Sequence, residues 1–157
     1  MKKLLVLLVV VAVAAFGAYR LGYLDEYVGP KGEVVDQAYV RDNVGKPGVV
    51  LVDVRGRAVY DGKSPREGIP GGHIPGAVNF PIADLEKDGA QKALADAGIT
   101  KDATLIVYCN TGHNSTLFVR KLVRKFGYDP KKIMNYMGSM TDWSKNPENK
   151  IDTAAAN

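Results

Sequence analysis

The chain has 157 residues, of which 46% are hydrophobic and 24% are charged. This balance is typical of one globular domain and excludes a disordered, collagen-like or coiled-coil protein. The formal net charge is only +4 and the lysines are scattered, so the composition does not predict a nucleic-acid partner. A single cysteine excludes an internal disulfide, a CxxC redox pair and a cysteine-rich zinc site.

Residues 1–24 have the pattern of a signal peptide or a membrane anchor. Lys2 and Lys3 precede an apolar run over residues 4–18 whose second half is rich in alanine, and this order is typical of an export signal. Beyond the lysines only Arg20 is charged up to residue 24, so an uncleaved anchor fits as well. Both alternatives keep the lysines in the cytoplasm. We therefore expect the rest of the chain to be extracytoplasmic, either periplasmic or anchored to the inner membrane and facing the periplasm.

Residues 31–151 are predicted to form one α/β domain. Two short runs, VVLVDV and TLIVY, are apolar except for Asp53 and Thr104, which is typical of strands buried on both faces of a parallel sheet. Helical patterns lie between the strands, and this alternation indicates an α/β fold. The predicted strands are 33–35, 49–54, 104–108 and 133–136, and the predicted helices are 37–44, 90–97 and 115–126. We expect Asp36 to cap the start of the first of these helices.

The helix predicted at 115–126 is amphipathic. We expect Ser115 or Thr116 to cap its start and Gly127 to end it. One face is basic, and we expect it to be solvated and to draw anions toward the start of the helix. The apolar face holds Phe118, Val119, Leu122, Val123 and Phe126, and the basic face holds Arg120, Lys121, Arg124 and Lys125.

The single cysteine lies at a position suited to chemistry. Cys109 follows the buried strand 104–108, and the polar segment Asn-Thr-Gly-His-Asn separates it from the next helix. Parallel α/β sheets place their sites at the carboxyl ends of strands, and the N–H groups of a loop before a helix attract anions. Such a cradle favours a nucleophilic thiolate, and Gly112 would allow a tight loop. The alternative is a cysteine that only fills the core, but the polar residues after it favour the reactive role.

Four further polar residues have both a functional and a structural interpretation. His113 either tunes the charge near Cys109 or is a solvated histidine. His73 could serve in acid–base chemistry, although a hydrogen-bonded turn is the favoured interpretation. Asp53 and Arg55 either line the site or form a buried ion pair. We expect no zinc site from the cysteine and the two histidines, because the ligands are too few and wrongly spaced.

Four segments resemble the signatures of one known family. The most specific is GGHIPGAVNFP at residues 71–81, and the other segments keep the family's order and spacing. On these residues the chain resembles a single-domain rhodanese, a member of a sulfurtransferase family, over roughly residues 33–151. The other matching segments are VDVR at 52–55, IVYCNTGHNS at 106–115 and GSMTDW at 138–143.

The resemblance implies a central parallel sheet of about five strands flanked by helices, and a sulfurtransferase activity. By this resemblance Cys109 takes a sulfane sulfur from a donor of the thiosulfate or polysulfide type and holds it as a persulfide. The cysteine then passes the sulfur to a thiophilic acceptor such as a thiol or cyanide. No metal or organic cofactor is implied. The matching persulfide-binding loop consists of Asn110, Thr111, Gly112, His113 and Asn114.

One loop position departs from the family pattern. Many members carry arginine, and others threonine, where this chain has Asn114. Without that cation the loop attracts an anionic donor less strongly, so we expect weaker turnover of thiosulfate and leave neutral or polysulfide donors open. Related phosphatases with this fold need an arginine at the end of a longer loop, and this chain has Ser115 at that position. The loop therefore does not predict a phosphatase.

Two functions from different classes fit this sequence. The first is an enzyme that works by a ping-pong mechanism with Cys109 as the nucleophile. The second is a noncatalytic rhodanese-like domain that carries sulfur or binds a partner. The presence of both Cys109 and Gly112 favours the enzyme.

Overall fold

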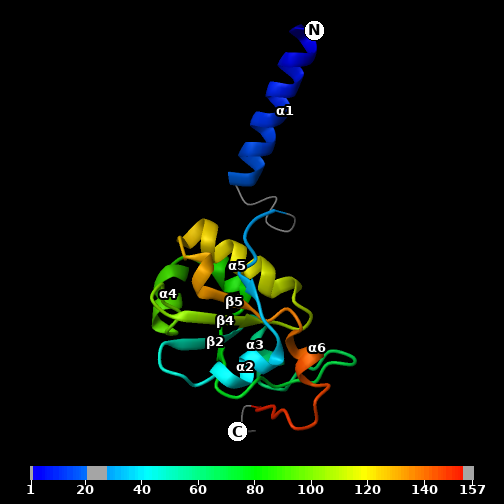
Figure 1. Cartoon of the computed structure of the whole chain (residues 1–157), viewed down its shortest axis with the longest axis vertical. Helices are drawn as coiled ribbons and strands as arrows, with labels where there is room; N and C mark the ends of the chain where they lie inside the picture. The colour runs from blue at the N-terminus through cyan, green and yellow to red at the C-terminus, as the bar shows by residue number, and fades with distance from the viewer. Residues whose placement is uncertain (1, 21–27, 154–157) are drawn as a thin grey trace.

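The computed structural model describes residues 2–20 and 28–153 (Figure 1). Helix α1 (Lys2–Arg20) stands apart from the remaining elements, and its large apolar side chains between Leu4 and Phe16 are exposed. Within the described residues no helix is long and apolar enough to cross a membrane. Residues 1 and 21–24 of the predicted signal or anchor lie outside the described residues, and export stays a prediction.

A five-stranded parallel sheet forms the centre of the domain. The strand order is β1-β5-β4-β2-β3, and every neighbouring pair is parallel. This confirms the predicted α/β fold with a parallel sheet. The short strand β3 had no signal in the sequence, because it has only two half-buried residues. The strands are β1 (Glu33–Val34), β2 (Val49–Asp53), β3 (Val78–Asn79), β4 (Thr104–Tyr108) and β5 (Ile133–Asn135).

The two central strands, β2 and β4, are buried on both faces, as their mainly apolar sequences predict. In β4, Leu105 and Val107 belong to one apolar cluster, and Ile106 and Tyr108 belong to another. Successive side chains of a strand point to opposite faces, so these clusters are the two halves of the core. Cys109 follows on the same face as Leu105 and Val107 and belongs to the same apolar cluster.

Helices cover both faces of the sheet. Figure 1 shows α4 and α5 on one side and α2, α3 and α6 on the other. The start of α2 is capped as predicted, because the Asp36 carboxylate accepts the N–H of Tyr39 at 2.8 Å. The helices of the domain are α2 (Gln37–Asn43), α3 (Arg57–Tyr60), η1 (Ile82–Glu86), α4 (Ala90–Asp96), α5 (His113–Phe126), η2 (Pro130–Lys132) and α6 (Ser139–Trp143).

Helix α5 begins two residues earlier than predicted, and its predicted cap is wrong. Gly112 is the N-cap residue in a left-handed conformation with φ of 87°, and no side chain caps the helix. Ser115 and Thr116 lie inside the first turn, where both hydroxyls donate to the carbonyl oxygen of Gly112, at 3.0 and 2.8 Å. A capping side chain belongs to the residue before the first turn, which is Gly112 here, and hydroxyls inside the turn instead donate back to that residue. Gly127 ends the helix in a left-handed conformation, as predicted.

The basic face of α5 is only partly solvated, which corrects the prediction. Lys121 and Lys125 bind the two carboxylate oxygens of Glu86 at 2.7 and 3.0 Å. Lys125 also donates to the carbonyl oxygen of Leu85 at 3.0 Å. These contacts tie α5 to η1 over the same half of the core.

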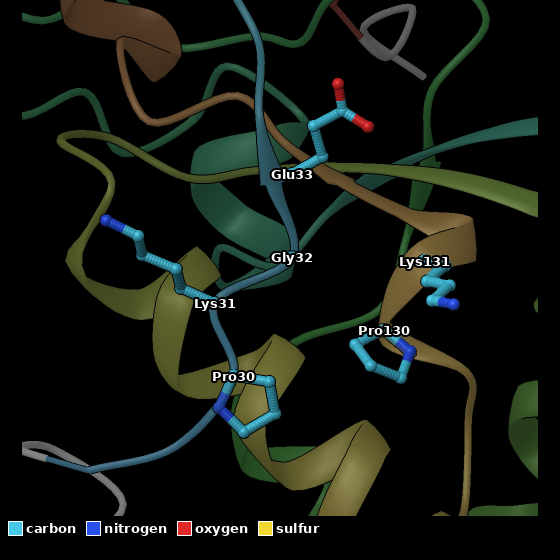
Figure 2. A pocket seen from close by; sticks show the side chains of 6 residues that line it. All are labelled: Pro30, Lys31, Gly32, Glu33, Pro130 and Lys131. Carbon is cyan, nitrogen blue, oxygen red and sulfur yellow. The ribbon is translucent and has the colours of Figure 1, made fainter.

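A pocket of about 330 Å³ lies at the amino ends of β1 and β5 (Figure 2). Gly32 is required there, since a Cβ atom on it would lie 2.5 Å from the carbonyl oxygen of Ile133. Figure 2 shows the side chains of Lys31 and Lys131 pointing in opposite directions, so their ammonium groups do not converge on one ligand. The amino ends of parallel strands all lie at one end of the sheet, and their carboxyl ends at the other. This pocket therefore lies at the opposite end of the sheet from Cys109, which follows the carboxyl end of β4.

Candidate active site

Cys109 lies at the carboxyl edge of the sheet, directly after β4 and three residues before the N-cap of α5. Its side chain is only 2% exposed and packs against the apolar cluster that includes Val107 and Phe118. The strand therefore fixes the position of the sulfur, and the following turn determines which polar groups surround it.

The backbone N–H of Gly112 donates to the Sγ atom of Cys109 at 3.1 Å. This close approach needs a glycine for two reasons. The φ of 87° disfavours any residue with a side chain, and a Cβ atom would lie 2.5 Å from the carbonyl oxygen of Met137. The predicted tight turn at Gly112 is confirmed, and it aims a hydrogen-bond donor at the sulfur.

Ser139 supports the cysteine from a distant part of the sequence. Its Oγ accepts the N–H of Cys109 at 3.1 Å, donates to the carbonyl oxygen of Tyr136 at 2.8 Å and lies 3.8 Å from Sγ. Ser139 is fully buried, and its φ of 53° is in the left-handed region that favours glycine. The segment GSMTDW carries part of the family resemblance, but its sequence alone indicates no role for the serine.

The start of α6 also holds the backbone of the loop. The N–H of Met140 donates to the carbonyl oxygen of Cys109 at 3.1 Å. Thr141 donates to the carbonyl oxygen of Asn110 from both its N–H, at 3.0 Å, and its hydroxyl, at 2.8 Å. Two consecutive carbonyl groups of the loop are therefore bound by the first residues of α6.

Asp53 and Arg55 combine the two roles proposed from the sequence. They form a buried ion pair with 2.6 Å between Oδ2 and Nη2, and the Nη1 atom of Arg55 donates to Oδ1 of Asn110 at 3.3 Å. Arg55 also donates to the carbonyl oxygen of Gly72. Burial alone would lower the pKa of Arg55, but the hydrogen bonds and charge of Asp53 hold that pKa above its usual value. The permanently charged guanidinium thus links β2 to the first residue of the loop.

The remaining predicted loop residues differ in their surroundings. Thr111, His113 and Asn114 are exposed, and the last two are the first residues of α5 and not part of the loop. Thr111, Gly112 and His113 line a pocket of about 320 Å³ that continues along α5. Asn114 does not contribute to the lining of that pocket.

His73 has a structural role in the described part of the chain. Its Nδ1 atom is 2.9 Å from the carbonyl oxygen of Tyr60, and the two rings stack with centroids 3.6 Å apart. Its backbone pairs with Asp152 in an antiparallel bridge. These contacts agree with the favoured interpretation, a hydrogen-bonded turn. Over residues 2–20 and 28–153 no group of three or more His, Cys, Asp or Glu side chains could hold a metal ion.

The arrangement around Cys109 suits an anionic sulfur. A backbone N–H already points at Sγ, and α5 starts beside it with its positive dipole end toward the loop. The first N–H groups of a helix have no acceptor within the helix, so they are available to an anion placed there. The site can therefore stabilise a thiolate, or an anion attached to the sulfur.

The fold and the site together define an α/β domain with a buried cysteine at the carboxyl edge of its parallel sheet, next to the start of a helix. The model of the family described as Rhodanese-like domain matches residues 36–146. The chain belongs to the rhodanese-like family.

Two relatives connect this family to sulfur transfer. The sulfur carrier protein TtuD of Thermus thermophilus is 35% identical over 144 residues, which cover 81% of this chain and 48% of TtuD. A thiosulfate sulfurtransferase of Azotobacter vinelandii is 31% identical over 110 residues, which cover 60% of this chain and 40% of that enzyme. The chain spans less than half the length of each of these relatives. They support a role in sulfur transfer in general.

Solved structures share the fold at low sequence identity. A structure of EanB with ergothioneine linked to a persulfide cysteine has a TM-score of 0.70 and 20% identity, and it covers 78% of this chain and 28% of the other. An anaerobic ergothioneine biosynthesis enzyme from Chlorobium limicola, bound to trimethyl histidine, has a TM-score of 0.67 and the same coverage. These similarities establish the five-stranded sheet flanked by helices as a shared fold.

Proposed function

We propose that this protein is a rhodanese-type sulfurtransferase that carries a sulfane sulfur on Cys109. The hydrogen bond from Gly112 N–H to Sγ is the observation that carries the proposal, because it stabilises a negative sulfur. The family and the sulfur-transfer relatives support the same chemistry. No metal or organic cofactor takes part in the proposed reaction.

The proposed reaction has two displacement steps. In the first, the Cys109 thiolate attacks the sulfane sulfur of the donor, the donor's bond to that sulfur breaks, and the electron pair leaves with the remaining fragment. For thiosulfate that fragment is sulfite. In the second, a thiophilic acceptor attacks the outer sulfur of the persulfide, and the electron pair of the broken S–S bond returns to Sγ. Charge and atoms balance in both steps without an oxidant.

In this proposal the loop after Cys109 binds the persulfide. Gly112 supplies a direct N–H donor, and Asn110 is held in place by Arg55 and Thr141. The N–H groups of the first turn of α5, including that of Asn114, point toward the N-terminal end of the helix. The helix dipole favours an anion at that end. The side chains of Thr111 in the loop and of His113 at the start of α5 are exposed at the rim, where a donor or acceptor arrives.

Mass spectrometry of the intact protein tests the proposal. After incubation with thiosulfate or a polysulfide, the wild-type protein should gain one sulfur atom, and cyanide should remove it. Cys109→Ser should fold normally and gain no sulfur, since the chain has no second cysteine. Sulfur uptake by Cys109→Ser would exclude the proposed mechanism.

A sulfur carrier is the second candidate function. It is favoured by one observation, the 35% identity to a protein named as a sulfur carrier. A carrier would form the same persulfide but would not discharge it to small acceptors at a catalytic rate. Steady-state turnover with cyanide distinguishes the two functions, because an enzyme completes many cycles and a carrier discharges once to a dedicated partner.

We also propose that the domain, residues 31–151, works outside the cytoplasm. The two N-terminal lysines and the exposed apolar side chains of α1 support export or anchoring through residues 1–24. A reporter active only in the periplasm, fused after Asn157, should be active in the full chain. The same fusion without residues 2–18 should be inactive. Activity of a reporter that works only in the cytoplasm would contradict the proposal.

A further inference from the structure

The loops at the amino end of the sheet gather lysines that are scattered in the sequence. Four adjacent strands, in the order β1-β5-β4-β2, each follow a loop that holds at least one exposed lysine. Neighbouring strands lie about 4.8 Å apart, so these loops form one surface about 15 Å wide. We call it the amino-edge surface. Its lysines are Lys31 before β1, Lys131 and Lys132 before β5, Lys101 before β4 and Lys46 before β2.

The positive charge of the amino-edge surface is not neutralised locally. Within the described residues, none of its five lysines forms an ion pair with a carboxylate. The Nζ atom of Lys101 lies 5.9 Å from the ring centroid of Tyr128, and Lys132 donates to the backbone carbonyl oxygen of Asp102 at 3.4 Å. The same loops carry two exposed aspartates, Asp102 and Asp129, so positive charge stays in excess.

The lysines spread their charge over an area and do not surround one point. Lys31 and Lys131 line the same pocket, but Figure 2 shows them pointing in opposite directions. The carboxylate of Glu33 points in a third direction in the same view. A small anion needs donors that converge on it, whereas diverging ammonium groups attract an extended surface of negative charge.

The amino-edge surface is separate from the candidate active site. Cys109 follows the carboxyl end of β4, and a strand of this length places its two ends about 17 Å apart. Near the cysteine loop the charge of Arg55 is paired with that of Asp53. The lysines at the amino end therefore have a partner other than the sulfur donor or acceptor.

The N-terminal segment joins the domain at this same surface. Pro30 and Lys31 line the pocket at the amino ends of β1 and β5, so the chain coming from α1 enters there. Residues 21–27 connect α1 to this point and reach no further than about 30 Å even when fully extended. The large apolar side chains of α1 are exposed. A membrane that holds α1 therefore lies within reach of the lysines.

We propose that the amino-edge surface binds the anionic lipid headgroups of the membrane that holds residues 1–24, with Cys109 facing away from the bilayer. This inference rests on the proposed export of the domain and selects its anchored form. An apolar segment together with a basic surface holds a protein on a membrane more firmly than either does alone. Each lysine close to an anionic bilayer raises the affinity about fivefold. The domain is then oriented with its active site open to the solvent.

Chemical labelling of lysines tests this orientation on the full chain. The protein is bound to vesicles of phosphatidylcholine alone, or of phosphatidylcholine and anionic phosphatidylglycerol in equal parts. An amine-reactive reagent is added, and the labelled sites are identified by mass spectrometry. On the anionic vesicles we expect protection of Lys31, Lys101, Lys131 and Lys132, which salt should reverse. Equal labelling of these lysines on both kinds of vesicle would overturn the inference.

Lysines elsewhere on the domain provide the internal control. Lys63 follows α3 and Lys145 follows α6, and both are exposed outside the amino-edge surface. Their labelling should be the same on both kinds of vesicle.

Paired variants separate the position of the charge from its amount. The double variant Lys131→Gln/Lys132→Gln should bind the anionic vesicles about 25-fold more weakly than wild type. Lys63→Gln/Lys145→Gln removes the same charge and should lose much less. Both variants should load sulfur in solution as wild type does, since none of these side chains contacts the cysteine loop. Equal losses of vesicle binding in the two variants would show that only net charge matters, and the inference would be wrong.

The anchoring proposal and this inference fail in different ways. If the full chain binds neither kind of vesicle, anchoring through residues 1–24 is wrong, and this inference is wrong with it. If the chain binds both kinds equally and its lysines stay accessible, anchoring stands and only the role of the amino-edge surface is wrong. If the lysines become protected at high protein concentration without vesicles, a second copy of the chain covers them and the inference is also wrong.

Discussion

Gly112 donates its backbone N–H to the Sγ atom of Cys109, three positions earlier in the chain, at 3.1 Å. The same glycine is the N-cap of α5 and lies against the carbonyl oxygen of Met137. One residue therefore connects the sulfur, the positive end of a helix and the segment that leads into α6. Substituting it should affect the chemistry and the packing together.

We predict that Gly112→Ala lowers both stability and sulfur loading. The left-handed φ of 87° costs an alanine about 1–2 kcal/mol, and the clash with Met137 must be relieved by moving the turn. That movement withdraws the N–H from Sγ, so persulfide formation should slow. Urea unfolding and the rate of sulfur uptake measure the two effects.

Gly89→Ala is the matched control for this prediction. Gly89 is the N-cap of α4 with φ of 77°, and no described atom lies within 4 Å of the position that an alanine methyl group would take there. The control should lose only the conformational part of the stability, about 1–2 kcal/mol, and load sulfur normally. Equal losses in the two variants would show that contact with Met137 is unimportant.

We predict that Arg55→Met destabilises the protein by about 3–5 kcal/mol, because it leaves the fully buried carboxylate of Asp53 without its partner. The double variant Asp53→Leu/Arg55→Met removes both charges and should be less destabilised than Arg55→Met alone. Both variants also release Asn110, so sulfur loading should slow even where the protein stays folded. Denaturant unfolding of Asp53→Leu, Arg55→Met and the double variant measures the coupling energy between the two charges. If the losses in the free energy of unfolding of the two single variants add up to that of the double variant, the prediction is wrong.

We predict that Asn114→Arg raises turnover of thiosulfate. Thiosulfate and the Cys109 thiolate are both negative, and Asn114 offers only a neutral amide where an arginine would offset the repulsion. A charge-assisted contact realised in the transition state corresponds to about 10- to 100-fold in rate. The measurement is kcat/KM for thiosulfate with cyanide as the acceptor, at low and high salt.

Asn114→Gln serves as the neutral control, and the gain from arginine should shrink as salt rises. If Asn114→Arg folds and leaves kcat/KM unchanged or lower, charge at this position does not set the choice of donor.

We predict a small, pH-dependent contribution of Glu86 to stability. Hydrogen bonds from Lys121 and Lys125 lower the pKa of Glu86 below its usual value. A carboxylate with a lowered pKa stabilises the fold above the unfolded-state pKa, and this stabilisation is lost as the pH falls through the folded-state pKa. The side chain is 56% exposed, so the contribution is about 1 kcal/mol or less. Glu86→Gln should therefore be less stable than wild type at pH 7 and equally stable near pH 3, and an equal difference at both pH values would contradict the assignment.

The sequence determined the elements whose signal is local. The mainly apolar runs at 49–54 and 104–108 identified the two central strands, because strands that are buried on both faces consist mostly of apolar residues. The cap at Asp36 and the stop at Gly127 depend on neighbouring residues only, so they too were predicted correctly. Cys109 was identified as the candidate nucleophile because a polar segment follows a buried strand.

Only the tertiary structure decided which distant groups meet at the cysteine. Ser139 lies 30 residues from Cys109 in the sequence yet binds its N–H and approaches its sulfur, because β5 pairs beside β4 and delivers α6 to the same edge. Arg55 reaches Asn110 from β2 for the same reason. Side-chain periodicity reports which face of an element is buried, but strand order and packing determine what that face contacts.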